Sequence, residues 1–413
     1  MSFRKMLITG TPMAFICLVS VMSCSRMETT TDMDLFSSAF RLAEQQCDMM
    51  VREVNAARDT WKKLNEGKSK PVPVSPRTLI NGDLVLVPSH DWTSGFFPGM
   101  LWCLYEHTGQ IKWLEQARTF TSYVEQEQWN GKTHDMGFKI YCSVGKGFRL
   151  TGDTVYRNII IQAAKTLTTR FKPAAGILRS WDHSRNKWDC PVIIDNLMNL
   201  ELLFEATKLT GDSSFYDIAV SHAQTTMKNH YRDDGSSFHV LDYDTITGKV
   251  IKKNTHQGYS HDSAWSRGQA WGLYGYTMCF RETGDRQFLD HAEKIASFIL
   301  NHSNLPNDLV PYWDFDAPGI PNEPRDASAA SVMASALYEL STYSTAGSGY
   351  RNAANKILES LYGHYTSEVG KNSGFILLHS TGSKPSDSEV DVPLIYGDYY
   401  FLEALLWKKK LDG

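Results

Sequence analysis

The 413-residue sequence predicts an all-α fold in which helical hairpins follow one another along the chain. A repeated Thr-Gly turn and an alternation of apolar helices with amphipathic ones are the two observations that predict it. The composition, with 42% apolar and 21% charged residues, is close to that of ordinary globular chains. The helices therefore have enough apolar surface to form a large core.

The turn occurs four times, beginning at Thr108, Thr151, Thr210 and Thr283. The Gly after each Thr is expected to end one helix, and the polar residue after it to cap the next. An aromatic side chain five positions after the Thr would pack back on the first helix. Each copy therefore predicts a helical hairpin. The four aromatic residues are Trp113, Tyr156, Phe215 and Phe288.

Apolar periodicity predicts about twelve helices in about six pairs. The second helix of a pair, as at 195–209 or 264–281, is apolar on most faces, so we expect it to lie inside. The first helix, as at 112–126 or 213–229, carries a charged stripe that is typical of an outer layer. Two such rings make an (α/α)6 barrel, and an open solenoid of the same pairs is the alternative.

Two segments depart from the helical pattern. Residues 235–253 contain two alternating runs around a turn, which predict a small β-hairpin inserted in the barrel. Residues 311–325 hold four prolines and predict an ordered loop. Because no linker or low-complexity segment follows residue 35, residues 36–413 are expected to form a single domain.

The N-terminal residues have the organisation of an export signal. Two basic residues precede an apolar run over 6–22, which is too short and too interrupted for a comfortable membrane span. The following Ser23-Cys24 is similar to a bacterial lipoprotein cleavage site. We expect a lipoprotein-type signal peptide over 1–24 and a polar tether over 25–35. The protein would then be periplasmic or membrane-anchored through Cys24, in a Gram-negative bacterium.

Charge and cysteine usage argue against two classes of partner. The formal net charge is −4 and no basic block occurs, so we do not expect nucleic acid to bind. The seven cysteines include no C-x-x-C pair and have no His pair at ligand spacing beside them, so neither a metal nor a cofactor is predicted. Those beyond Cys24 lie in apolar stretches, which predicts buried free thiols.

Two carboxylates are expected at the starts of inner helices, at Asp135 and Asp195. Either could be a helix cap that stabilises the macrodipole. That explanation suits Asp195 less well, because Asn196 and Asn199 join it in an otherwise apolar helix. Pro191 is expected to begin that helix. At one mouth of the barrel the two acids would form the carboxylate pair that glycoside hydrolysis uses.

Other polar side chains are expected at the same mouth. The hairpin offers His239, and the run from 254 to 271 concentrates polar groups at the start of another inner helix. Arg267 and Trp271 would share a helix face, and a cation beside a stacking ring suits an anionic sugar whose carboxylate the Arg binds bidentately. Each residue alone could equally be structural. The run 379–384 could contact a second sugar or a sulfate, or be a solvated turn.

Taken together, these motifs resemble those of the unsaturated glucuronyl hydrolases, glycoside hydrolase family 88. They recur in order through most of the chain after the signal. The matching motifs are His134-Asp135-Met136-Gly137-Phe138, Asp195-Asn196-Leu197-Met198-Asn199-Leu200, Phe238-His239-Val240 with Asp242, His256-Gln257-Gly258-Tyr259, Trp265-Ser266-Arg267-Gly268-Gln269-Ala270-Trp271 and Asp391-Val392-Pro393-Leu394.

The resemblance implies an (α/α)6 barrel with no metal or cofactor. It implies release of a 4,5-unsaturated uronic acid from glycosaminoglycan oligosaccharides by hydration of the C4=C5 double bond. Asp195 would be the general acid and base, and Asp135 would stabilise the cationic transition state. Substrate contacts are implied for His134, His239, Gln257, Arg267, Trp92, Trp181 and Trp271.

Two other functions remain open at this stage. An unsaturated rhamnogalacturonyl hydrolase would share the architecture and chemistry but act on pectin fragments, although the His-Asp-Met-Gly-Phe motif argues against it. A non-catalytic glycan-binding lipoprotein would use the aromatic mouth without the acid pair. The run Ser380-Thr381-Gly382-Ser383-Lys384 matches the sulfate-reading pattern of the family imperfectly, so a preference for sulfated sugars is not predicted.

Overall fold

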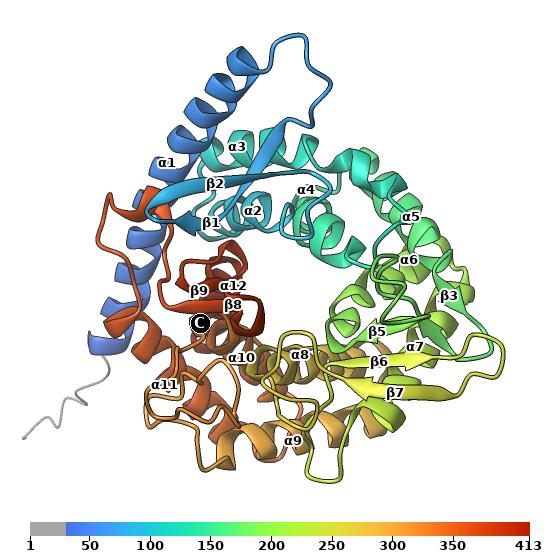
Figure 1. The fold of residues 1–413 in the computed structure, drawn as a ribbon. Coiled ribbons are helices and arrows are strands. Elements are labelled where there is room, and N and C mark those ends of the chain that lie inside the picture. Colours follow the sequence, from blue (N-terminus) through green and yellow to red (C-terminus); the bar gives the residue numbers. More distant parts are fainter. Residues whose placement is uncertain (1–29) are drawn as a thin grey trace, which may run out of the picture.

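The computed structural model describes residues 30–413, whose long helices form two concentric rings (Figure 1). Along the chain each outer helix is followed by an inner one. The outer helices are α1 (Thr30–Leu64), α3 (Ile111–Ser122), α5 (Thr154–Thr168), α7 (Ser213–His230), α9 (Arg286–Asn301) and α11 (Gly347–His364). The inner helices are α2 (Phe96–Thr108), η2 with α4 (Gly137–Gly145 and Lys146–Thr151), η3 with α6 (Ile194–Asn199 and Glu201–Thr210), α8 (Ser266–Thr283), α10 (Ala327–Leu340) and α12 (Ile395–Asp412).

The inner ring is closed. Helix α12, the last of the chain, packs against α10 on one side and against α2 on the other. In α10 every residue is buried, whereas outer helices such as α9 bury one face and expose charged residues on the other. The (α/α)6 barrel is therefore confirmed over the open solenoid.

The four Thr-Gly turns end helices as predicted. Gly109, Gly152, Gly211 and Gly284 adopt left-handed φ values between 65° and 75°, which glycine reaches without steric cost. In three copies the following Asp caps the next helix by accepting a backbone N–H two residues on. The four aromatic residues that follow are buried. These hairpins follow from local sequence because both the helix stop and the next cap are local.

Short antiparallel sheets and single turns connect the helices. The predicted hairpin is present and pairs with a third strand in the order β5-β6-β7. Three further two-stranded sheets were not predicted. The strands are β1 (Pro73–Ile80), β2 (Asp83–Pro88), β3 (Phe171–Lys172), β4 (Ile177–Leu178), β5 (Pro191–Ile193), β6 (Val240–Tyr243), β7 (Val250–Asn254), β8 (Ser380–Ser383) and β9 (Ser388–Val392), and the short helical turns are η1 (Glu125–Trp129), η4 (Asn372–Gly374) and η5 (Lys384–Ser386).

Two boundaries differ from the prediction. Pro191 begins strand β5 and not a helix, because β5 pairs with β6, and the helix starts at Ile194 with a 3-10 turn. Helix α1 begins at Thr30, so residues 30–35, expected in the polar tether, are helical. The predicted signal peptide, including Cys24, lies outside the described residues.

The described residues also bear on the thiols and on membrane spans. The five cysteines between residues 30 and 413 are all free, and four of them are buried. None of the helices in this range is long and apolar enough to cross a membrane.

Candidate active site

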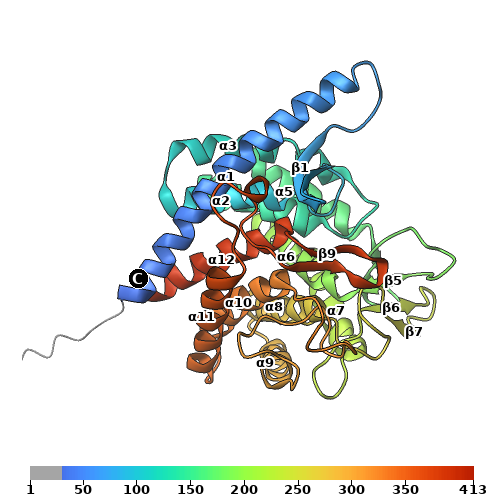
Figure 2. The ribbon, with the colours of Figure 1, turned by 60° about the vertical axis from the view of Figure 1, so that its left-hand side comes forward.

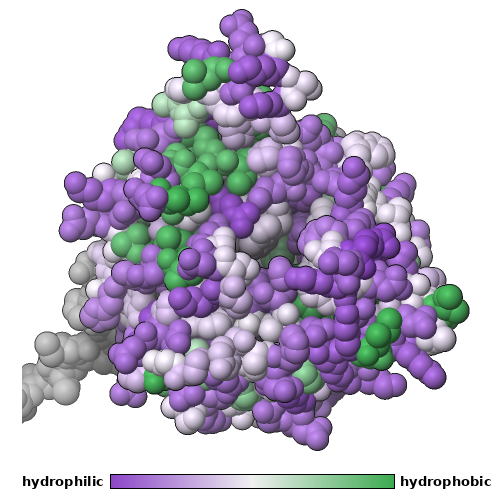
Figure 3. Space-filling model, viewed as in Figure 1, coloured by the Kyte–Doolittle hydropathy of each residue, from purple (hydrophilic) through white to green (hydrophobic). Residues whose placement is uncertain are grey.

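The N-terminal ends of the inner helices meet at one mouth of the barrel. In the side view the sheets lie on this side of the rings (Figure 2). The space-filling view of the same face shows a central hollow with mostly hydrophilic residues around it (Figure 3). Asp135 directly precedes the helix that begins at Met136, and Asp195 lies in the first turn of η3. The prediction that both acids lie at the starts of inner helices is therefore confirmed.

Asp195 has the properties of a group that exchanges a proton near neutral pH. It is 8% exposed, and its Oδ2 is buried without a hydrogen-bond partner among residues 30–413. Burial raises the pKa of Asp195 to about 7, since loss of water disfavours the carboxylate. The charge of Arg267 opposes this rise in pKa, and the charge of Asp135 adds to it. The two acids are therefore electrostatically coupled.

His239 faces Asp195, with 3.7 Å between its Nε2 and Oδ2 of Asp195. Its Nδ1 accepts the backbone N–H groups of His256 and Gln257, each at 3.1 Å. Burial, followed by the charges of His256 and Arg267, lowers the pKa of His239 well below its usual value, so the ring is neutral. A neutral ring whose Nδ1 accepts must carry its proton on Nε2. His239 is therefore a fixed N–H donor directed at Asp195.

Asp135 is held by its own turn. Its Oδ2 accepts the Thr133 hydroxyl at 2.5 Å, and its Oδ1 lies 3.1 Å from His134 Nε2. The side chain is 19% exposed, so it remains open to the mouth. His134 is 3% exposed and contacts Asp135. It therefore supports the acid, whereas the resemblance implied a substrate contact for it.

Asn199 joins the two acid-bearing turns. Its Oδ1 accepts the backbone N–H groups of Gly137 at 2.8 Å and Phe138 at 3.1 Å, which caps the helix that follows Asp135. A side chain at position 137 would bring its Cβ within 2.6 Å of the Asn199 Cα, so only glycine allows this approach. Asn199 lies in the 3-10 helix η3 together with Asp195, but its side chain caps the neighbouring helix.

Arg267 is buried, and its terminal nitrogens are already bonded. Its Nη1 donates to Asp326 and to the Thr381 carbonyl, and its Nη2 donates to the Gly382 carbonyl, each at 2.5 Å. Both N–H bonds of Nη1 are therefore used, so the predicted bidentate grip on a carboxylate could use only Nε–H and the remaining Nη2–H. Gln257 Nε2 donates to the same Gly382 carbonyl at 3.1 Å. Both side chains thus hold strand β8 at the mouth, and Arg267 supplies positive potential at Asp195.

The three predicted tryptophans lie at different depths. Trp271 is fully buried against Phe138, with ring centroids 5.3 Å apart, and its indole N–H lies beside Asp195, where it opposes the rise in the pKa of that carboxyl. Trp92 and Trp181 are half-buried; Trp92 lies in the turn before α2, and Trp181 lies in the segment before β5. Trp271 thus lies buried at the bottom of the mouth, whereas Trp92 and Trp181 remain accessible to a ligand.

Two residues at this mouth were missed by the sequence analysis. Tyr396 is buried, its hydroxyl has no partner among residues 30–413, and its ring centroid is 4.9 Å from that of Trp92. Asp326 accepts a hydrogen bond from Arg267 and caps α10 by accepting hydrogen bonds from the Ser328 and Ala329 N–H groups. The signals for them were weak: Tyr396 closely follows the Asp391 motif, and an Asp before an alanine-rich helix reads as an ordinary cap.

Comparisons with known proteins agree with this geometry. Residues 77–403 match the profile of Glycosyl Hydrolase Family 88. An unsaturated glucuronyl hydrolase of Formosa agariphila is 51% identical over 327 residues, which cover 79% of this chain and 82% of that protein. An unsaturated chondroitin disaccharide hydrolase of Streptococcus pneumoniae is 32% identical and covers 88% of this chain and 90% of its own.

A solved structure of an unsaturated glucuronyl hydrolase specific for heparin superposes with a TM-score of 0.86 at 44% identity. The match covers 92% of this chain and 98% of that one. These likenesses favour the catalytic interpretation over a glycan-binding lipoprotein. The chain is a glycoside hydrolase and belongs to glycoside hydrolase family 88.

Proposed function

We propose that the enzyme removes a 4,5-unsaturated uronic acid from the non-reducing end of glycosaminoglycan fragments by hydrating its C4=C5 double bond. The observation that carries this proposal is Asp195, a buried carboxyl whose pKa is raised to about 7 and whose Oδ2 has no partner among residues 30–413. Such a group is available both as an acid and as a base near neutral pH. The printed names of the relatives, glucuronyl and chondroitin disaccharide hydrolases, support the substrate class.

In the proposed reaction, protonated Asp195 donates its proton to C4 of the vinyl ether. The cation that develops at C5 is stabilised by the side chain of Asp135, which its Thr133 and His134 contacts hold in place. The carboxylate of Asp195 then accepts a proton from the water that adds to C5, which restores the acid. The resulting C5 hemiketal opens, and the hemiacetal left at C1 releases the neighbouring sugar.

The surrounding residues would orient the substrate and the water. The Nε2–H of His239 can donate to the carboxylate of Asp195 or to a water beside it. Trp92 and Trp181 would stack on sugar faces at the rim. Arg267 and Gln257 would act through the strand that they hold and through the charge of the guanidinium.

A panel of unsaturated disaccharides tests the proposal. Chondroitin, hyaluronan, heparin and rhamnogalacturonan disaccharides each lose the ultraviolet absorbance of the conjugated double bond when it is hydrated. We expect loss on at least one glycosaminoglycan disaccharide. If absorbance falls only with the rhamnogalacturonan disaccharide, the enzyme is an unsaturated rhamnogalacturonyl hydrolase. If absorbance falls with none of the disaccharides, the catalytic proposal is overturned.

We also propose that the enzyme is exported and acylated at Cys24, in the periplasm or on a membrane of a Gram-negative bacterium. The basic start, the apolar run over 6–22 and Ser23-Cys24 support this. Mass spectrometry of the mature protein should find a lipid-modified Cys24 at the N-terminus. A Cys24→Ala variant should leave the membrane fraction, and a mature N-terminus elsewhere would contradict the proposal.

A further inference from the structure

A second cavity, of about 990 Å³, occupies the other half of the barrel. Most of its lining comes from the later parts of the inner helices, within residues 141–149, 201–208, 274–282 and 399–410, and Gly137 and Met198 reach it from the two acid-bearing turns. The acids and Arg267 lie at or before the first turns of those helices. Between the two regions Trp271, beside Asp195, packs on Tyr400, with ring centroids 5.4 Å apart, and Tyr400 lines the cavity. Trp271 and Tyr400 therefore lie between Asp195 and the cavity.

The most unusual group in the cavity is Arg149. It has neither a hydrogen bond nor an ion pair with any residue between 30 and 413, and it is accessible to solvent inside the cavity. Glu106 and Glu201 act on Arg149 electrostatically, but neither lies within ion-pair distance of it. By contrast, Arg281 of the same cavity is bonded to three carboxylates. A guanidinium without a carboxylate partner is a ready site for an anionic group.

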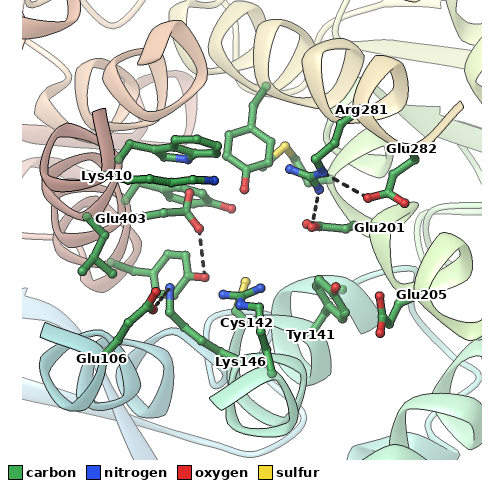
Figure 4. Close-up of a pocket in the computed structure, with 18 of the residues that line it drawn as sticks. Glu106, Tyr141, Cys142, Lys146, Glu201, Glu205, Arg281, Glu282, Glu403 and Lys410 are labelled. Atoms are coloured by element: carbon green, nitrogen blue, oxygen red, sulfur yellow. Dashed lines mark hydrogen bonds and ion pairs between the residues drawn. The ribbon is translucent and has the colours of Figure 1, made fainter. Parts of the chain in front are cut away.

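Hydroxyl and carboxylate groups complete the lining. The hydroxyls of Tyr141 and Tyr274 have no hydrogen-bond partner in the described part of the chain, although Tyr274 is only 8% exposed. Glu403 accepts the hydroxyls of Ser335 and Tyr399, but no described cation lies within ion-pair distance of it. Figure 4 shows Glu403, Tyr141 and the paired Glu201 around one open space. Among the residues that the structure describes, the cavity therefore offers Arg149, Lys409 and Lys410 without a carboxylate partner, one carboxylate without an ion pair and two free hydroxyls.

This combination matches the chemistry of a sugar that carries an acidic group. The guanidinium of Arg149 would take the acid, the tyrosine hydroxyls and Glu403 would bond to sugar hydroxyls, and the tyrosine rings would cover the carbon skeleton. The volume lies at the upper end of the usual range for small-ligand pockets, which is about 300–1,000 Å³. Lys409 and Lys410 line the cavity with exposed side chains that form no ion pair among the described residues, whereas Lys208 is paired with Glu205 and Glu282.

We infer that this cavity is a second binding site, separate from the acid pair, for a small anionic sugar such as a uronate or a sulfated hexosamine. The site does not depend on the proposed reaction, because the side chains proposed to bind the sugar lie outside the mouth and only Gly137 and Met198 of the acid-bearing turns reach the cavity lining. An acidic monosaccharide could be released by the enzyme or taken from the surroundings, and either would offer the same anionic group to Arg149. Two probes, one with a carboxylate and one with a sulfate, distinguish which anionic group the site binds.

Calorimetric titration of the Asp195→Asn protein tests the inference without turnover. The probes are D-glucuronate and N-acetylglucosamine 6-sulfate, with uncharged N-acetylglucosamine as the control ligand. We expect one saturable site per chain for at least one acidic probe and weaker binding of the uncharged sugar. Adding Arg149→Gln should weaken the acidic probe about tenfold or more, which is the loss expected for one charge-assisted hydrogen bond.

Matched variants keep the inference falsifiable. Arg118→Gln, which removes an exposed arginine from the outer helix α3, should leave binding unchanged. Tyr274→Phe keeps the ring and removes only the hydroxyl, so it serves if Arg149→Gln does not fold, and it should also weaken binding. Trp181→Ala at the mouth should have no effect. The inference is overturned if no acidic probe binds, if the cavity variants bind as well as their parent, or if Trp181→Ala abolishes binding. Turnover of the wild-type enzyme on disaccharides is measured separately, so the second binding site and the proposed reaction can each be refuted without the other.

Discussion

The two halves of the barrel both bury carboxylates, but they do so with different consequences. Burial raises the pKa of Glu201 and Glu339 in the rear half, as it raises the pKa of Asp195 at the mouth. In the rear half Arg281 bonds both glutamates and Glu282. At the mouth no described lysine or arginine lies within ion-pair distance of Asp195. The titratable side chain that faces it is His239, which is neutral. A paired acid is a structural element, whereas an unpaired one can move a proton.

Asp398 sharpens the comparison, because its pKa is also raised by burial, to about 8. Its two oxygens accept the backbone N–H groups of Ile376 and Leu377, at 2.8 and 2.7 Å, and neither is left for a substrate. A raised pKa therefore does not identify the catalytic acid by itself. The unbonded, buried Oδ2 of Asp195 distinguishes the two aspartates.

The largest expected effect is on turnover. Asp195→Asn should lower kcat by about a thousandfold, since it removes the group that gives and takes the proton, with little change in KM. Asp398→Asn should retain turnover within a few-fold per folded molecule and lose stability instead. Steady-state kinetics and unfolding curves of both variants make the test. Near-normal turnover of Asp195→Asn would contradict the role assignment.

The pH dependence of stability should differ between wild type and Asp195→Asn. The pKa of Asp195 is raised in the folded state from 3.8 to about 7, so this group favours folding below about pH 4, and the advantage is lost as pH rises to about 7. Because asparagine does not titrate, the variant should gain up to about 4 kcal/mol relative to wild type between these pH values. Urea unfolding at several pH values measures it. Parallel pH profiles would show that Asp195 is not perturbed.

Breaking the rear ion-pair cluster should cost stability and not chemistry. Arg281→Met leaves Glu339, Glu282 and Glu201 without their common cation, and removal of one partner from a buried ion pair costs about 3 kcal/mol. The exposed fraction of the Arg281 side chain, 27%, keeps this at the lower end of the range. Unfolding curves measure the loss. A larger effect on kcat than on stability would mean that the two halves are not separable.

The smallest of these effects should come from the link between the two acid-bearing turns. Asn199→Ala removes the acceptor of the Gly137 and Phe138 N–H groups, which should cost about 1–2 kcal/mol of stability. It should also lower kcat several-fold, because the helix after Asp135 loses its cap. Asn199→Asp restores an acceptor and should recover the stability. If alanine leaves kcat unchanged, the cap does not position Asp135.

The parts of the fold that local sequence predicted are those with local causes. The helix stops at Gly109 and Gly211 and the caps at Asp212 and Asp285 depend on residues a few positions apart. Pro191 shows the limit of this reasoning. Its preference for a first helical position was overridden by pairing of β5 with β6, which begins about fifty residues later in the chain.

The candidate site was predicted in its members but not in their roles. Asp135, Asp195 and His239 were named from motifs, and the structure brings them to one mouth. The bonds of Arg267 to Thr381 and Gly382 join distant segments, so its spacing from Trp271 could not reveal that both N–H groups of Nη1 and one of Nη2 are used within the protein. The charge state of His239 likewise depends on the amides of the loop that reaches it.

The sequence by itself determined the helical hairpins, the inner and outer helix types and the motif residues, because short-range periodicity and capping encode them. Only the tertiary structure decided the closure of the ring, the proton position on His239 and the desolvation that raises the pKa of Asp195. These properties depend on atoms contributed by remote segments. Burial and electrostatics are sums over such neighbours, and they exist only once the chain has folded.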